Sequence, residues 1–228
     1  MAPPPAAALE AARRGCKVIL ACPKMNPGGM TASGLCTTDA VRRELFGGLV
    51  EEFVAKVRAR YQQTIGENNP DYALTRDGWF YEPSVAEDVF EEMLGEQSER
   101  LTYLRGYHLT RVETADSRIT GISLDDPAGN VHQFAATTFI DGTYEGDLAA
   151  KAGVPFRVGR EGREEFGESL AGIHYMDWKK GEQIMTPDTG EPSPAIQAYC
   201  ARSIFTTDPD KLVPLEKPEN YEQHLPDL

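Results

Sequence analysis

The chain has 228 residues, of which 40% are hydrophobic, so it can bury a core in one large domain or in one domain and part of a second. Its formal net charge of −13 argues against nucleic acid and anionic membrane as partners and favours simple solubility. No apolar run approaches the roughly 20 residues of a membrane helix, and the first residues lack the basic segment of a signal peptide. The four cysteines form no C-x-x-C pair, which predicts free thiols in a reducing compartment, the cytoplasm: Cys16, Cys22, Cys36 and Cys200.

Residues 6–14 are strong helix formers followed by Gly15, and residues 17–21 predict a buried strand. A helix and then an apolar strand form the second half of a βαβ unit. A dinucleotide-binding unit begins with a strand and G-x-G-x-x-G, whose backbone N–H groups hold a pyrophosphate. This sequence begins with MAPPP, and proline has no N–H. We therefore expect a Rossmann-like unit that is missing its first strand and phosphate loop.

The segment after this strand contains the first candidate binding residues. Such folds usually place an acidic residue at the end of the second strand to bind ribose hydroxyls, but Cys22 stands there. Lys24 could meet a phosphate, or it could be a solvated loop lysine. Residues 27–39, PGGMTASGLCTTD, predict a sharp turn and then a stretch dense in hydroxyl groups. That density suits a polar ligand, and it equally suits a solvent-exposed loop.

The middle of the chain reads as two core helices separated by a loop. Apolar residues recur every four positions in residues 45–61, which predicts an amphipathic helix. Residues 66–82 are loop-like and end in the aromatic cluster 79–81, for which packing is favoured over a cavity lining. Ser84 and Glu87 fit a capping box that begins the next helix.

A run of short strands follows and leads into a glycine turn. Residues 101–104, 107–113, 118–124 and 131–136 predict a small antiparallel meander. Residues 135–140 read as a buried strand, ended by Asp141 and Gly142. Gly146 and Asp147 then open a short helix, where Asp147 is either a plain helix cap or a carboxylate for sugar or polyol hydroxyls.

Three blocks carry a resemblance to a known family. Residues 141–162, DGTYEGDLAAKAGVPFRVGREG, closely resemble one block of a family of FAD-dependent oxidoreductases. Residues 27–39 and residues 82–94, EPSVAEDVFEEML, match two further blocks in the family's order. The resemblance implies FAD as cofactor. It also implies an α/β fold: a parallel Rossmann-like sheet with flanking helices and a small antiparallel meander.

The resemblance also implies roles for individual residues. Asp147 would hold the ribityl chain of FAD, and the loop at residues 27–31 would run past the flavin. The candidate cofactor contacts are Lys24, Gly28, Gly29, Met30, Thr31, Gly142, Gly146 and Asp147. No catalytic residue is assigned. No metal site is expected, because the four histidines lack ligand spacing: His108, His132, His174 and His224.

The resemblance covers roughly residues 6–175; a charged stretch lies near its end, and a proline-rich segment follows it. Residues 157–165 could form a solvated charged face. The resemblance implies that this stretch leads into the substrate region, which makes Arg157, Arg160 and Arg163 candidates for binding an anionic group of a substrate. Seven prolines fall in residues 186–228, which predicts an extended or partly disordered tail. The expected organisation is therefore a partial FAD-binding domain at residues 6–175, followed by the start of a substrate region or a tail at residues 176–228.

The predicted function is flavin-mediated hydride transfer with an unidentified small organic substrate. One alternative is a non-catalytic fragment of such an enzyme that binds FAD weakly or not at all. A second alternative is a flavoprotein that processes carbohydrate or polysaccharide. The sequence leaves the oligomeric state open.

Overall fold

The computed structural model describes residues 3–38, 40–177, 182–184, 189–197, 202–203, 205–214 and 216–217. The chain forms two compact units, Met1–Gln197 and Ala198–Leu228. The boundary predicted after residue 175 separates a cofactor-binding domain from a substrate region or tail. It is not a boundary between compact units, and it stays a prediction. Two residues named above, Cys200 and His224, lie outside the described residues, as does Asp39, the last residue of the segment 27–39.

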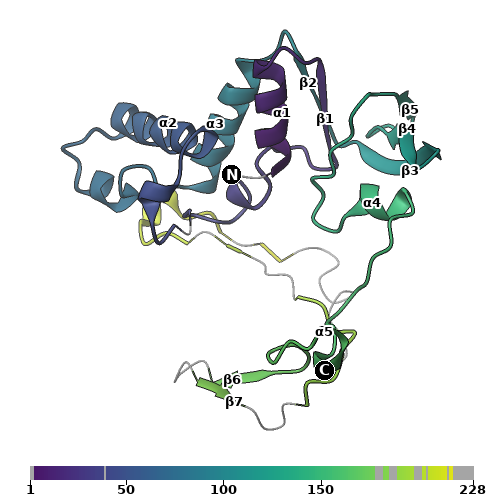
Figure 1. The fold of residues 1–228 in the computed structure, drawn as a ribbon. Helices are drawn as coiled ribbons and strands as arrows, with labels where there is room; N and C mark the ends of the chain where they lie inside the picture. Colours follow the sequence, from purple (N-terminus) through teal and green to yellow (C-terminus); the bar gives the residue numbers. More distant parts are fainter. Residues whose placement is uncertain are drawn as a thin grey trace. The chain divides into compact units, whose positions relative to one another are not determined.

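A two-stranded parallel sheet and the helix before it confirm the predicted start of the chain (Figure 1). Helix α1 spans Pro3–Arg13, and Gly15 follows with a φ of +88°. Strand β1, Val18–Cys22, pairs in parallel with β2, Leu101–Arg105. The prediction that residues 101–104 begin the antiparallel meander is wrong. The chain between β1 and β2 crosses over through two helices, and such a crossover brings strands together in parallel.

These two helices are α2, Leu49–Thr64, and α3, Pro83–Gly95. Helix α2 begins four residues later than its apolar pattern predicted, because Gly48 has non-helical backbone angles; Leu45 is 71% exposed. Helix α3 begins at Pro83 with Glu82 as its N-cap and no side-chain cap. The capping box predicted at Ser84 is therefore wrong, since Ser84 lies inside the first turn.

The core lies between α1, α2, α3 and the parallel sheet. The Phe53 ring stands 4.9 Å from the Phe90 ring and 5.6 Å from the Tyr81 ring, measured between centroids. The Trp79 ring packs edge-on against Phe46 at 5.8 Å. The favoured interpretation of residues 79–81 as packing is thus confirmed for Trp79 and Tyr81. The fully buried large side chains are Leu9, Phe53, Val57, Val89, Phe90 and Met93.

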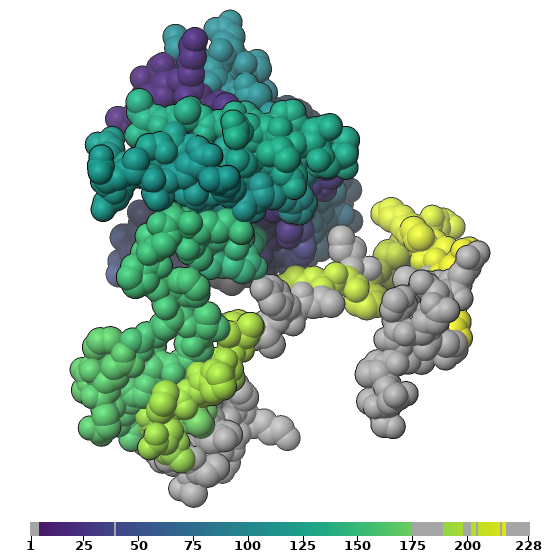
Figure 2. Space-filling view, turned by 90° about the vertical axis from the view of Figure 1, so that its right-hand side faces the viewer, coloured from purple at the N-terminus to yellow at the C-terminus, as the bar shows by residue number. Residues whose placement is uncertain are grey.

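The predicted meander is a three-stranded antiparallel sheet in the order β3-β4-β5. Its strands are His108–Ala115, Arg118–Asp125 and Val131–Phe134. The short helix α4, Asp147–Lys151, contacts β3 and buries Leu148. In Figure 2 the teal sheet lies directly on the green segment that contains α4.

Residues 135–140 do not form the buried strand that their composition predicted. Strand β5 ends at Phe134, residues 135–138 are exposed, and Ile140 is 64% exposed. Apolar and β-branched residues adopt a strand only where a neighbouring strand pairs with their backbone. Among the described residues, no strand pairs with this segment.

The remaining elements are short. They are the 3₁₀ helices Gly29–Thr31 (η1), Arg43–Leu45 (η2), Pro70–Thr75 (η3) and Pro209–Lys211 (η4), helix α5 at Arg163–Phe166, and the hairpin of β6, Tyr175–Asp177, with β7, Glu182–Ile184. The described part of residues 186–228 contains no α-helix or strand beyond an isolated bridge at Ser193. Within the described ranges, no helix has the length and apolar character needed to cross a membrane.

Candidate cofactor site

The glycine loop, residues 24–31, follows the carboxyl end of β1. Pro27 and Gly28 are buried, and Gly28 has a φ of +93°. A Cβ atom at Gly28 would lie 2.5 Å from Cδ2 of Phe90 in α3, so the loop can pack here only with a glycine. Gly29 begins η1, and Met30 and Thr31 complete it. Close packing against Phe90 therefore explains why residue 28 is a glycine, and the sequence did not reveal this reason.

The aspartate loop, residues 141–147, is held together by its own side chains. The Asp141 carboxylate accepts hydrogen bonds from Thr143 N and Ala149 N, each at 2.9 Å, and from Thr143 Oγ1 at 2.7 Å. Thr143 Oγ1 in turn accepts hydrogen bonds from Gly146 N at 2.9 Å and Asp147 N at 2.8 Å. Partial burial pushes the pKa of Asp141 upward, but these hydrogen bonds outweigh it and hold the pKa below its ordinary value.

Asp147 is the first residue of α4, and its side chain is exposed. The N-cap of this helix is Gly146, in the left-handed conformation at φ +77°, and the N–H groups of the first turn are satisfied by Thr143 and Asp141 rather than by Asp147. The interpretation of Asp147 as a plain helix cap is therefore wrong. Its carboxylate accepts no hydrogen bond from the described residues, so it is available to a ligand.

A hydrogen bond joins the two loops, although 114 positions separate its partners. Met30 N donates to the Tyr144 hydroxyl at 2.7 Å. The Lys24 ammonium lies 5.9 Å from the centroid of the Tyr144 ring. The structure thus brings together the two loops that contain all eight predicted contacts. Sequence reasoning missed Tyr144, Asp141 and Thr143. The turn pattern Asp-Gly-Thr could have indicated the hydrogen bond from Thr143 N to Asp141 within the aspartate loop.

Lys24 differs from the arginine that ends β2. Both terminal nitrogens of Arg105 donate to Glu91 at 2.6 Å, and Arg105 Nη1 also donates to Met25 O at 3.2 Å. The bond to Glu91 raises the pKa of Arg105 and neutralises its charge locally. Lys24 is exposed and makes no ion pair with any described residue. It is therefore the better placed of the two cations to meet a phosphate.

These residues fit one part of the cofactor that the resemblance implies. FAD presents ribityl hydroxyls, which need acceptors, and a pyrophosphate, which needs positive charge. The exposed Asp147 carboxylate supplies acceptors, and the Lys24 ammonium supplies charge. A Cβ at Gly146 would meet no atom within 4 Å, so this backbone opens onto free space. The two loops are thus suited to the ribityl and pyrophosphate portion of FAD.

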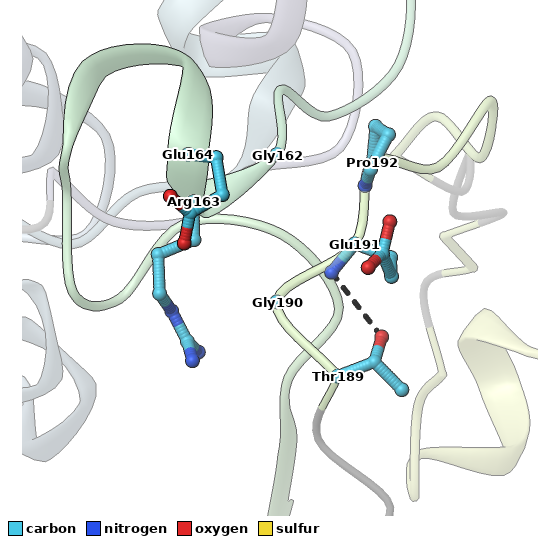
Figure 3. A pocket seen from close by; sticks show the side chains of 7 residues that line it. All are labelled: Gly162, Arg163, Glu164, Thr189, Gly190, Glu191 and Pro192. Carbon is cyan, nitrogen blue, oxygen red and sulfur yellow. Dashed lines mark hydrogen bonds between the residues drawn. The ribbon is translucent and has the colours of Figure 1, made fainter.

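The three arginines proposed for an anionic substrate are engaged locally. Arg157 forms a two-pronged ion pair with Glu165, and the hydrogen bond to Glu165 raises the pKa of Arg157. The Arg160 guanidinium donates to Gly172 O at 3.5 Å, and the Arg160 backbone exchanges hydrogen bonds with Ser193. The Arg163 side chain lies against Gly190 and lines a pocket of about 130 Å³ (Figure 3). That volume is well below the roughly 300 Å³ at which small-molecule sites begin.

Two of the histidines with described side chains, His132 and His174, also have local partners. His132 donates from Nε2 to Asp126 at 2.9 Å, and the His174 Nε2 atom lies 3.1 Å from Ala171 O. In the part of the chain that the structure describes, no group of three or more His, Cys, Asp or Glu residues could hold a metal ion.

Comparison with known proteins adds one match. The family model described as FAD dependent oxidoreductase matches residues 5–228, nearly the whole chain. A search of curated proteins finds no match. The family match extends well beyond the three blocks that carried the resemblance.

Proposed function

The chain belongs to the FAD-dependent oxidoreductase family, whose cofactor is FAD, and on this premise we propose that the glycine loop and the aspartate loop form its FAD-binding site. The observation that carries the proposal is the hydrogen bond from Met30 N to the Tyr144 hydroxyl, which joins the two loops. Its second support is the Asp147 carboxylate, which has no structural partner among the described residues.

Each residue of the site has a role that follows from its chemistry. Asp147 accepts hydrogen bonds from ribityl hydroxyls, and such charge-assisted bonds are about twice as strong as neutral ones. Lys24 offsets the charge of the pyrophosphate. Gly146 leaves the backbone open to close approach by the ligand. When bound, FAD supplies the capacity to accept and return a hydride.

We further propose that the chain is an active oxidoreductase with a small organic substrate, and that it works in the cytoplasm. The family match supports the first part. The second part is supported by Cys16, Cys22 and Cys36, which are free thiols in the structure. A screen of small organic substrates, with sugars and polyols included, tests the activity by following the loss of the oxidised flavin spectrum.

Titration of the purified chain with FAD, followed by flavin fluorescence, tests the site itself. We expect saturable binding, and we expect Asp147→Asn to raise Kd at least tenfold, which corresponds to ~1.4 kcal/mol. The matched control is Asp116→Asn, which removes an exposed carboxylate from the turn between β3 and β4 and should leave Kd unchanged. If the unmodified chain binds no FAD, the proposal fails and the non-catalytic alternative is favoured.

A further inference from the structure

We propose that Tyr144 is a positioning residue that fastens the glycine loop to the aspartate loop and holds Lys24 beside them. This inference rests on the proposed function, because its effect is expressed through FAD binding. Tyr144 contacts the glycine loop twice, through its hydroxyl to Met30 and through its ring to Lys24.

The hydroxyl of Tyr144 satisfies a backbone donor that has no other partner in its helix. Met30 is the second residue of η1, and the first hydrogen bond within that turn comes from Thr31 N to Gly28 O. The N–H groups that open a helix lack acceptors inside it and need one from elsewhere. Tyr144 provides that acceptor at 2.7 Å, from a loop far away in the sequence.

The loop that carries Tyr144 is braced on both sides of it. Asp141 and Thr143 fix the backbone before Tyr144, and Thr143 Oγ1 fixes Gly146 and Asp147 after it. Tyr144 is 59% exposed, so burial in a core does not explain its position. We attribute its position to the hydrogen bond between its hydroxyl and the glycine loop.

The ring of Tyr144 restrains the cation of the site. A lysine ammonium is attracted to the face of an aromatic ring within about 6 Å of its centroid, and Lys24 lies at 5.9 Å. An exposed lysine otherwise samples many rotamers, and that freedom is lost on binding a phosphate. Because the two loops are already joined and Lys24 is already restrained, less conformational entropy is lost when FAD binds. The affinity for FAD is therefore higher.

The variant Tyr144→Phe tests this inference, because it keeps the ring and removes only the acceptor. We expect its Kd for FAD to rise about fivefold, the factor that corresponds to ~1 kcal/mol for one hydrogen bond. In the chain without FAD, we expect the Met30 amide hydrogen to exchange faster, while the thermal unfolding midpoint falls by at most about 2–4 °C, the shift expected when one hydrogen bond is lost from a chain of this size. Tyr144→Leu removes the ring as well and should weaken FAD binding further.

The control is Tyr107→Phe. Tyr107 belongs to neither loop, and its hydroxyl makes no hydrogen bond with the described residues. It should change neither Kd nor the exchange of Met30. If Tyr144→Phe binds FAD like the unmodified chain and Met30 exchanges at the same rate, the inference is overturned while the proposed function stands. If the unmodified chain binds no FAD, the proposed function fails, and the Met30 exchange rate still decides whether Tyr144 fastens the loops. A fall in the unfolding midpoint well beyond about 4 °C in Tyr144→Phe would point to a structural role and would also overturn the inference.

Discussion

Gly28 and Gly146 both take left-handed backbone angles at the site, but for different physical reasons. A side chain at Gly28 would collide with Phe90, whereas a side chain at Gly146 would meet open space. We therefore expect Gly28→Ala to lower the free energy of unfolding by about 3 kcal/mol, from backbone strain and overpacking together. Gly146→Ala carries strain alone and should cost about 1 kcal/mol. Urea unfolding of the two variants measures the difference, and equal losses would contradict it.

Asp141 is the residue on which the shape of the aspartate loop depends. Asp141→Asn keeps the size of the side chain but turns an amide N–H₂ group toward one of its donors. We expect a loss of about 1.5 kcal/mol in the free energy of unfolding, the lower end for a hydrogen bond to a charged group. Asp116→Asn is again the matched control and should change stability little. Denaturant unfolding of both variants checks this, and a loss common to both would refute the role given to Asp141.

The carboxylates of Asp126 and Asp141 predict how stability depends on acid. Hydrogen bonds from His132 and Asn130, together with a weaker one from Ala128 N, hold the pKa of Asp126 well below its usual range. The pKa of Asp141 is lowered as well. Each carboxylate therefore stabilises the fold above the unfolded pKa of about 3.9, and this stabilisation is lost as the pH falls toward the folded pKa. The thermal unfolding midpoint should decrease as the pH is lowered below about 4. The decrease should be less steep in Asp126→Asn, and the same dependence on pH in both chains would contradict this.

At the scale of elements, local patterns predicted what depends on local physics. The helix before β1, the parallel strand β1 and the hairpin of β3 with β4 follow from composition, periodicity and turn residues. Pairing partners did not follow. Residues 101–104 and 135–140 have similar strand composition, yet the first pairs with β1 and the second pairs with no described strand. Whether such a segment forms a strand depends on whether another strand pairs with it, and the local sequence does not show which segments pair.

The turn between β3 and β4 offers a test at this scale. Asp116 and Ser117 both have positive φ, at 50° and 62°, which is the geometry of a type I′ turn. Glycine adopts this conformation without the penalty that serine carries. Ser117→Gly should therefore stabilise the chain by about 0.5 kcal/mol and raise the thermal midpoint. Ser84→Gly, in the first turn of α3, should lower it, and the same sign for both variants would contradict the assignment.

At the scale of the molecule, the site exists only because the fold brings distant loops together. Lys24 and Asp147 could be proposed from the sequence, since their chemistry and the resemblance pointed to FAD. The bond from Met30 to Tyr144 could not be predicted, because it depends on how β1 and the segment before α4 meet in space. The same dependence explains why Asp147 could be distinguished from a helix cap only by its surroundings.

Binding at such a site should stabilise the whole unit by mass action. At an FAD concentration of 100 times Kd, the gain is about 2.7 kcal/mol, which corresponds to roughly 5–11 °C in the thermal midpoint for a chain of this size. Riboflavin lacks the pyrophosphate that Lys24 is proposed to meet, so it should bind more weakly and give a smaller shift at the same concentration. Thermal unfolding with each ligand measures this. Equal shifts would remove the role assigned to Lys24.

Amide hydrogen exchange of the unmodified chain, with and without saturating FAD, tests the location of the site most directly. We predict slower exchange on FAD binding in residues 24–31 and 141–147, the two loops joined by Met30 and Tyr144. The turn at Asp116 and Ser117 should exchange at the same rate in both samples. Protection elsewhere with none in these two loops, or no protection at any concentration of FAD, would contradict the site proposed for this chain.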